Sequence, residues 1–208
     1  MTLYVPSHFR VDDPKILDAF IAGNAFGTLV SSGPAGLHAS HIPFVPERDA
    51  AGALSLRFHL ARANPQSAAL GEAAHVLAIF QGPHGYVSPT WYENHPAVPT
   101  WNYAVVHAHG RVAPMDEAAL RGLLEQLSST YERGRPERWE MARTPPGFID
   151  KLLPVIIGFT LAVERIDGKF KLSQNRPGKD PERVIAALEA GGEPELAALM
   201  RDHPPRQR

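Results

Sequence analysis

The sequence predicts a mainly β protein of the α+β class, in which antiparallel strands close into a barrel with helices at its periphery. Six or seven segments have the alternation or composition of strands, and short turns join most of them. Strands and helices do not alternate along the chain as they would in a parallel Rossmann sheet. Together these two observations favour an antiparallel barrel.

The N-terminal part predicts one helix followed by a hairpin. Residues 12–24 place apolar side chains on one helical face, and Pro14 suits the first turn. Residues 26–32 have a strand composition, and residues 37–45 form a weaker candidate strand. Pro43 indicates an edge or a strand end, because proline cannot donate to a sheet ladder.

The middle of the chain predicts three further strands. Residues 52–61 alternate clearly, and a short helix follows Asn64. Residues 75–83 read as a buried strand, and residues 100–115 as another. Between them we expect a long, proline-rich loop over residues 84–99, a length at which loops often carry function.

The C-terminal part predicts helices around one more hairpin. Residues 116–132 carry an apolar stripe at helical spacing. Residues 155–174 predict a hairpin with a type I′ turn at Asp167 and Gly168. Two short capped helices are expected at Pro181–Ala190 and Glu193–Arg201. We therefore expect a single domain over residues 1–208, with short C-terminal helices at about 180–201.

Composition narrows the function classes. The 208 residues are 44% hydrophobic and 21% charged, as in globular proteins. The net charge of −1 argues against a broad nucleic-acid-binding surface, although it leaves a local basic patch open. Cysteine is absent, which excludes disulfides and thiolate metal sites. No long apolar run and no signal-peptide pattern occur, so we expect a cytoplasmic protein without a membrane partner.

One candidate site lies where the strand over residues 52–61 ends. Arg62 offers a planar fork of donors that fits phosphate, and the helix after Asn64 adds backbone N–H groups. Ala61 and Ala63 would let a ligand approach the backbone closely. The alternative is an ordinary solvated arginine at a strand end.

Aromatic residues make a second candidate. Trp91, Tyr92, Trp101 and Tyr103 fall within one loop-and-strand unit. They would give flat walls to a flat ligand, or the anchors of a dimer interface. Ordinary core and loop packing explains them equally well.

The third candidate is a polar strand end at residues 171–176. It crowds hydrogen-bonding groups that suit an anion or the polar edge of a heterocycle, although such residues are also commonly just exposed. The members are Lys171, Ser173, Gln174, Asn175 and Arg176.

Other chemistry finds little support. His107 and His109 share a strand face, but without cysteines or paired carboxylates nearby we predict no metal site. Motifs of nucleophilic hydrolases, phosphate-binding loops and zinc proteases are absent from the sequence. The two terminal helices are too short and too acidic for a helix-turn-helix reader. No catalytic residue is assigned.

Four motifs in order resemble the PaiB-like family, the FMN-binding negative transcriptional regulators. They are HLARANPQ, IFQGPHGYVSPTWY, VPTWNYAVVHAHG and KLSQNR, and the N-terminal YVPSHF also fits. The resemblance extends from Tyr4 to about Leu188. It implies a split β-barrel of the flavin-binding kind, with FMN at the interface of a homodimer.

The resemblance also implies which residues hold the cofactor. Strands at 39–42 and 58–62 would form one wall, with Arg62 and Asn64 at the phosphate. The segment 101–103 would lie near the dimer seam, and residues of the 171–176 strand end would approach the flavin. The cofactor-binding candidates are Ser40, His41, His59, Leu60, Ala61, Arg62, Asn64, Trp101, Asn102, Tyr103, Lys171, Gln174, Asn175 and Arg176.

Two functions follow as hypotheses. The first is an FMN-binding homodimeric regulator that represses transcription directly or through a partner, with DNA contact unsupported by the net charge. The second is a flavin-dependent oxidoreductase that uses NAD(P)H, which fold analogy permits. Haem binding or breakdown, known in related split barrels, is a weaker third hypothesis.

Overall fold

The computed structural model describes residues 3–34, 36–71 and 74–204. The chain divides into two compact units. Unit 1 comprises the described residues of Met1–Phe20, Phe80–His107 and Asp167–Arg208. Unit 2 comprises those of Ile21–Ile79 and Ala108–Ile166. The expectation of a single domain over residues 1–208 stays a prediction.

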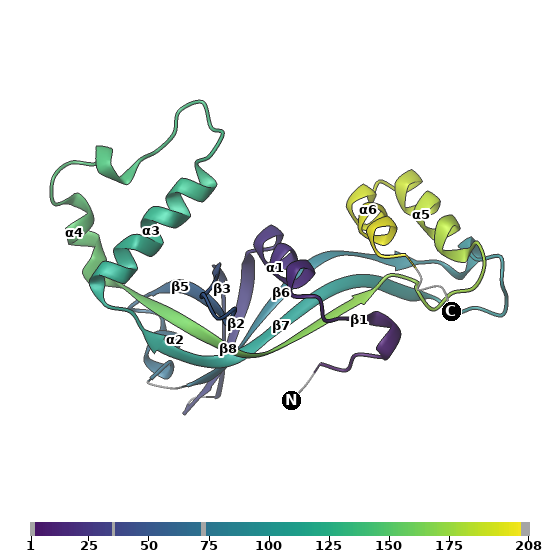
Figure 1. Ribbon diagram of the computed structural model, residues 1–208, viewed down its shortest axis with the longest axis horizontal. Helices are drawn as coiled ribbons and strands as arrows, with labels where there is room; N and C mark the ends of the chain where they lie inside the picture. The colour runs from purple at the N-terminus through teal and green to yellow at the C-terminus, as the bar shows by residue number, and fades with distance from the viewer. Residues whose placement is uncertain (1–2, 35, 72–73, 205–208) are drawn as a thin grey trace. The chain divides into compact units, whose positions relative to one another are not determined.

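Eight strands in the described part of the chain form one sheet (Figure 1). Its order is β3-β2-β6-β7-β8-β5-β4, and β1 pairs with β8. All pairings of known register are antiparallel, which confirms the predicted mainly β, antiparallel class. The strands are β1 (Arg10–Val11), β2 (Phe26–Gly33), β3 (Gly36–Pro43), β4 (Val45–Arg48), β5 (Leu54–Ala61), β6 (His75–Val87), β7 (Thr100–Pro114) and β8 (Ile156–Lys171).

Helices lie between and after these strands, as predicted for the longer ones. None of the described helices is long and apolar enough to cross a lipid bilayer. The α-helices are α1 (Pro14–Gly23), α2 (Pro65–Ala69), α3 (Glu117–Tyr131), α4 (Phe148–Leu152), α5 (Asp180–Ala190) and α6 (Pro194–Asp202). The 3-10 helices are η1 (Ser7–Phe9), η2 (Pro89–Trp91), η3 (Met141–Arg143) and η4 (Leu153–Val155).

The core of unit 2 follows from the alternation of β5. Leu54, Leu56, Phe58 and Leu60 are buried on one face, as predicted. The ring of Phe58 lies between two others, 5.2 Å from Phe44 and 5.6 Å from Phe159, an aromatic spacing that stabilises cores. Helix α3 begins at the predicted position, because the side chain of Asp116 accepts the N–H of Ala119 and caps it.

The predicted hairpin at Asp167 and Gly168 is wrong. Strand β8 runs unbroken through both residues, and Gly168 does not have the positive φ that a type I′ turn requires. Instead Gly168 pairs with Val11 of β1. A Cβ there would lie 2.7 Å from the Val11 carbonyl oxygen and 2.5 Å from Leu17, so glycine permits this close approach.

Two strand boundaries also differ from expectation. Strand β6 continues to Val87, so the predicted loop over 84–99 begins only after that residue. The expected strand 37–45 is divided, since β3 ends at Pro43 and β4 starts at Val45. Proline ends the ladder here, in keeping with the edge position that Pro43 predicted.

In unit 1 the last two helices pack against each other (Figure 1). Phe170 of β8 is buried and its ring centroid lies 4.9 Å from that of Phe20 and 4.9 Å from that of His203. Phe170 therefore packs between the end of α1 and the residue that follows α6.

Candidate functional site

In unit 2, Arg62 lies at the end of β5 and is held by backbone carbonyls. Its Nε donates to the carbonyl oxygen of Pro154 at 3.0 Å, and its Nη2 donates to that of Ile156 at 3.2 Å. The Arg62 side chain is exposed, and Nη1 makes no hydrogen bond to the described chain. The guanidinium is thus fixed in orientation and retains donors for an anion such as phosphate.

The helix after Asn64 contributes less to such a site than the sequence indicated. The side-chain oxygen of Asn64 accepts the N–H of Gln66 at 2.9 Å, and the Asn64 carbonyl accepts that of Ser67 at 2.9 Å. Pro65 has no N–H to offer. The first amides of α2 are therefore used within the chain, and Arg62 carries the anion-binding capacity here.

Asn64 joins two of the predicted wall segments. Its amide Nδ2 donates to the hydroxyl of Ser40 at 3.0 Å, which links the start of α2 to β3. His41 is exposed on the neighbouring position of β3, with Nδ1 2.9 Å from the hydroxyl of Thr28. Ser40 and Asn64 are thus joined directly, and Arg62 lies two residues before Asn64 in the same unit; their role in binding a cofactor stays a prediction.

The remaining candidates of β5 differ in what they expose. Leu60 is a core residue, and Ala61 is exposed. His59 is partly buried, and burial lowers its pKa. Its buried Nδ1 has no hydrogen-bond partner in the structure. A neutral imidazole with an unused nitrogen therefore lies on the strand that ends at Arg62.

Sequence reasoning missed Gln66, which is buried beside this group. Its Nε2 donates to the Leu29 carbonyl at 3.2 Å and to the Ser31 hydroxyl at 3.0 Å, while its buried Oε1 has no partner. Gln66 therefore fixes α2 against β2. A polar residue directly after a capping Asn-Pro pair is the only signal that the sequence offers for it.

In unit 1, β7 alternates between buried and accessible side chains. Trp101 is 54% exposed and Tyr103 is partly exposed, whereas Asn102 between them is completely buried. The Trp101 ring lies 6.1 Å from the Tyr86 ring and 6.5 Å from the His84 ring. Trp101 and Tyr103 therefore present aromatic surface, and Asn102 does not.

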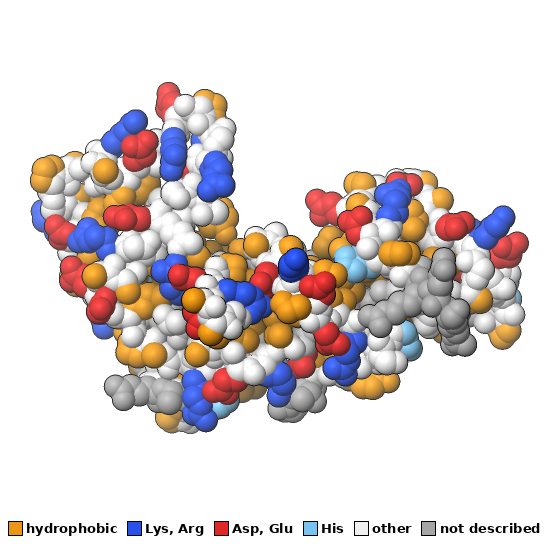
Figure 2. All heavy atoms as spheres, viewed as in Figure 1, with side chains coloured by type: hydrophobic (Ala, Val, Ile, Leu, Met, Phe, Trp, Pro, Cys, Tyr) orange, Lys and Arg blue, Asp and Glu red, His pale blue; other side chains and the backbone are white. Residues whose placement is uncertain are grey.

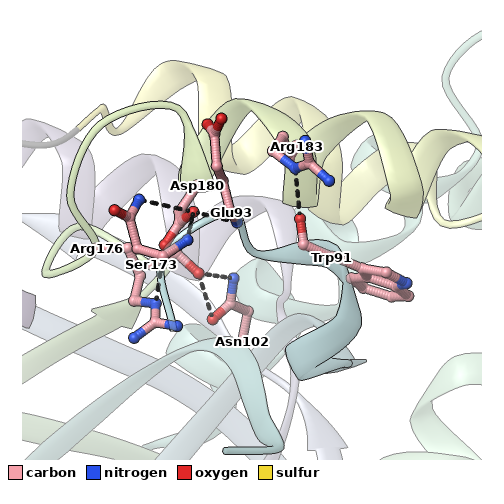
Figure 3. A network of polar contacts seen from close by, with 8 residues as sticks. Trp91, Glu93, Asn102, Ser173, Arg176, Asp180 and Arg183 are labelled. Carbon is pink, nitrogen blue, oxygen red and sulfur yellow. Dashed lines mark hydrogen bonds and ion pairs between the residues drawn. The ribbon is translucent and has the colours of Figure 1, made fainter. Parts of the chain in front are cut away.

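Asn102 instead holds Ser173, the second residue after β8. Its Nδ2 donates to the Ser173 hydroxyl at 2.9 Å, and this hydroxyl lies 3.3 Å from the Asn102 Oδ1 (Figure 3). Ser173 has a φ of 67°, an unfavourable region for residues other than glycine. The buried amide thus stabilises a strained turn of the chain.

Arg176 and Asp180 form a second buried arrangement (Figure 3). The Arg176 guanidinium lies 3.6 Å from the Tyr92 ring centroid, and its Nε lies 3.7 Å from an Asp180 oxygen. Asp180 is fully buried and accepts the backbone N–H groups of Glu93 at 2.8 Å and Asn94 at 3.2 Å. The first turn of α5 is thereby joined to the loop after β6.

The pKa of Asp180 is lowered by this environment. Burial alone would raise the pKa, but the hydrogen bonds from Glu93 and Asn94 and the charge of Arg176 outweigh it. Arg183 adds a further tie from α5, because its Nε donates to the Trp91 carbonyl at 2.8 Å (Figure 3). The sequence analysis assigned no role to Asp180, which directly precedes the helix expected at Pro181–Ala190.

The other residues of the strand end are divided between internal and exposed roles. Gln174 bridges its own turn, since Nε2 donates to the Phe170 carbonyl and Oε1 accepts the N–H of Leu172, both at 2.7 Å. Asn175 is exposed. Lys171 is partly buried, and burial followed by the charge of Lys169 lowers its pKa.

Comparison with known proteins agrees with these features. Residues 3–165 match the family model described as "Putative FMN-binding domain". The protease synthase and sporulation protein PAI 2 of Bacillus subtilis is 34% identical over 207 residues, covering 96% of this chain and 97% of that protein. An uncharacterized protein of Aspergillus fumigatus is 34% identical over 227 residues, covering 85% of this chain and 87% of that one.

Solved structures support the fold. The flavocytochrome Anf3 of Azotobacter vinelandii matches with a TM-score of 0.62 at 16% identity, over 84% of this chain and 73% of that one. The FAD and heme binding protein of Mycobacterium smegmatis matches with a TM-score of 0.59 at 19% identity, over 78% and 73%. The predicted split-barrel fold is thereby confirmed.

The family match decides the cofactor. Its description names FMN, and it covers the β5 end with Arg62 and Asn64 as well as β7. The predicted cofactor and the predicted PaiB-like resemblance are both confirmed. This chain belongs to the family of FMN-binding domains, in its PaiB-like branch.

Proposed function

We propose that this protein is an FMN-binding homodimer that acts as a negative regulator of transcription. The observation that carries the proposal is its 34% identity to the sporulation protein PAI 2, which extends over 96% of this chain. A relationship of that extent covers the whole fold and not one motif. A regulator of this kind would act in the cytoplasm.

Arg62 is the residue that we assign to the FMN phosphate. Its guanidinium is oriented by two carbonyls and keeps Nη1 for an oxyanion, and Ser40 and Asn64 place hydroxyl and amide groups nearby. Bound FMN would supply a flat, redox-active ring. Trp101 and Tyr103 stay candidates for contact with that ring, because their aromatic surface is accessible.

The other predicted ligands fall into two groups. Asn102 and Gln174 use their polar atoms within the chain, so we assign them to the support of the site. The Arg176 guanidinium lies on the Tyr92 ring, but its Nε and Nη2 are buried without a hydrogen-bond partner, so Arg176 stays a predicted ligand. Asn175 is exposed and stays a predicted ligand. His41, His59, Leu60, Ala61 and Lys171 also stay predictions.

An apolar face of unit 2 supports the homodimer. Val30 on β2 lies between Ala39 of β3 and Leu77 of β6 in the sheet register, and none of the three side chains is fully buried. Phe26 on β2 itself is 71% exposed, and Leu37 on β3 is 81% exposed. A second copy of this chain is the occupant that we propose, because symmetric dimers bury such self-complementary apolar patches.

Direct DNA contact would have to be local. The net charge is −1, and on the face shown in Figure 2 the lysine and arginine side chains are interspersed with aspartate and glutamate. A phosphate-contacting protein would lose affinity steeply as salt increases. Binding of operator DNA at low salt, lost at higher salt, would support direct repression. Absence of binding at low salt would leave only repression through a protein partner.

The experiment that tests the proposal is a visible absorption spectrum after loading with FMN and removal of the excess. The wild type should retain flavin bands, and Arg62→Ala should lose most of them. Arg133→Ala is the matched control, because Arg133 is an exposed arginine of the same unit and should leave the bands unchanged. Light scattering after gel filtration should give the mass of two chains. A wild type that retains no flavin, or stays monomeric, contradicts the proposal.

A second candidate function is a flavin-dependent oxidoreductase that uses NAD(P)H. The observation that favours it is His59, a neutral imidazole with an unused buried nitrogen near Arg62 in the sequence of β5. Such a group can accept or donate a proton. Oxidation of NADH or NADPH by the FMN-loaded protein, slowed at least tenfold by His59→Gln with flavin retained, would support the enzyme.

A further inference from the structure

Two lysines of unit 1 share one face of β8. Lys169 and Lys171 are two residues apart, so their side chains leave the strand on the same side. Gly168, Phe170 and Leu172 occupy the opposite side, where Phe170 and Leu172 are buried. Lys169 is only 8% exposed, which is unusual for a lysine.

Aromatic rings surround the Lys169 ammonium group. Its Nζ lies 5.4 Å from the Tyr4 ring centroid and 5.3 Å from that of Tyr103. Neither a hydrogen bond nor an ion pair joins the Lys169 side chain to the part of the chain that the structure describes. These two ring faces are the contacts that its ammonium group makes, and they replace a hydration shell incompletely, although the carboxylate of Asp167 lies two residues earlier on the same face of β8.

Lys171 has neutral partners only. Its Nζ donates to the Thr100 hydroxyl at 2.7 Å and to the Trp101 carbonyl at 2.5 Å, and lies 5.9 Å from the Phe9 ring centroid. No carboxylate in residues 3–34, 36–71 or 74–204 forms an ion pair with it. Burial and the charge of Lys169 both lower its pKa, so the two ammonium groups repel each other.

The nearest strand neighbour adds positive charge. Arg10 of β1 lies opposite Lys169 in the register, so it shares this face. Its guanidinium is 4.0 Å from Asp12, and both side chains are largely exposed. The carboxylate of Asp12 is thus engaged by Arg10 and does not neutralise the lysines.

We propose that Lys169 and Lys171 form a binding site for the oxyanion of a phosphate-bearing ligand. Buried cations without a counter-ion are costly, and proteins retain them where a ligand supplies the missing charge. Residues two apart on a strand are separated by about 7 Å, so their flexible side chains can converge on one phosphate group. The Thr100 hydroxyl provides a further polar group beside it.

The ligand has two sources with the same chemistry, namely the phosphate of FMN or that of a separate molecule. Calorimetric titration with inorganic phosphate at fixed ionic strength distinguishes them, using FMN-free and FMN-loaded full-length protein. Phosphate that binds only the FMN-free form, and binds more weakly to the lysine variants, identifies the site as the cofactor's own subsite and would overturn the proposed assignment of the FMN phosphate to Arg62. Phosphate that binds both forms identifies a second ligand. Both results support the anion site.

Three variants decide whether the lysines are responsible. Lys169→Met and Lys171→Met keep the apolar stem and remove the charge, and each should weaken phosphate binding at least tenfold. Lys179→Met is the matched control, because Lys179 is an exposed lysine of unit 1 and should leave the affinity unchanged. Wild-type protein that binds no phosphate, or lysine variants that bind it as tightly as wild type, overturns the proposal.

Thermal unfolding separates an anion-binding role from a purely structural one, because a purely structural Lys169 would lower the melting temperature when replaced. Without phosphate, Lys169→Met should melt at the same temperature as the wild type or higher, because it removes an uncompensated buried charge. Added phosphate should then raise the melting temperature of the wild type only. A variant that melts lower but binds phosphate normally would show that Lys169 serves the fold alone.

Discussion

Removal of the Asp180 carboxylate should destabilise unit 1 strongly. The carboxylate is fully buried and accepts two backbone N–H groups, at 2.8 Å from Glu93 and 3.2 Å from Asn94. It is also the ion-pair partner of Arg176. Asp180→Ala therefore leaves two backbone N–H groups, the Asn94 side-chain amide and one guanidinium without their acceptor at the start of α5.

The expected loss can be estimated from these contacts. Breaking a buried ion pair by removing one partner costs about 3–5 kcal/mol. The Arg176 side chain keeps 22% of its surface exposed, so the guanidinium recovers some hydration and the lower part of that range applies. We expect a loss of about 3 kcal/mol, which lowers the melting temperature of a chain of this size by roughly 6–12 °C. Asp180→Asn, which keeps the shape, should lose about half as much, roughly 1–2 kcal/mol.

Denaturant and thermal unfolding followed by circular dichroism measure this loss. Asp202→Ala is the matched control, because Asp202 is an exposed aspartate of α6 and should change the stability by less than about 0.5 kcal/mol. If Asp180→Ala changed the free energy of unfolding by less than about 1 kcal/mol, the network would not hold α5 in the way described.

The same network predicts a pH dependence. The pKa of Asp180 is lower in the folded chain than its ordinary value of 3.8, so the charged form is favoured by folding. Its contribution is complete above the ordinary value and is lost as the pH falls through the folded value. The stability difference between wild type and Asp180→Asn should therefore be constant near neutrality and shrink only in strong acid.

Three further predictions follow from single contacts. Gly168→Ala should lower the free energy of unfolding by about 1–3 kcal/mol, because the added Cβ meets a β1 carbonyl. Gly122→Ala, in open space on α3, should raise it slightly, and chemical denaturation measures both changes. Asn64→Ala removes the cap of α2 and should cost about 1 kcal/mol by the same assay, a loss that Asn64→Ser should largely avoid. Burial lowers the pKa of His59, so wild-type stability should fall from pH 7 to pH 5 more steeply than that of His59→Gln, and equal slopes would contradict this.

Much of the fold could be predicted because local pattern and tertiary environment agree. The alternation of β5 puts Leu54 and Phe58 in the core, and Asp116 caps α3 where the apolar stripe begins. Gly168 shows the opposite case. Asp-Gly favours a type I′ turn locally, but β1 packs so closely on β8 that the glycine is required for contact between strands. The local turn preference of Asp167-Gly168 is therefore overridden by the long-range pairing of β1 with β8, which the sequence does not reveal.

The sequence could indicate those candidate residues whose position is set by the local chain, and not those set by distant partners. Arg62 and Asn64 follow a strand directly, and a hydrogen bond joins Asn64 to Ser40, while their role in cofactor binding stays a prediction. Gln66 and Asp180 were missed because their partners are distant in the sequence: Gln66 bonds the Leu29 carbonyl, and Asp180 accepts the N–H of Glu93. A hydrogen bond between residues tens of positions apart leaves no local signal in one sequence.

The KLSQNR segment shows how internal bonding separates supporting residues from ligand-binding ones. Gln174 finds a partner within unit 1, because its amide donates to the Phe170 carbonyl, whereas Arg176 lies on the Tyr92 ring with two buried nitrogens that make no hydrogen bond. The Gln174 amide could reach a ligand only by leaving that carbonyl. Lys171 differs, because burial lowers its pKa and so disfavours its charged form. No carboxylate of the described chain forms an ion pair with it. One donor-rich motif thus contains a residue that supports the fold, Gln174, and a residue that we propose to bind an anion, Lys171. What distinguishes Lys171 is a partly buried charge without a counter-ion, and not polarity alone.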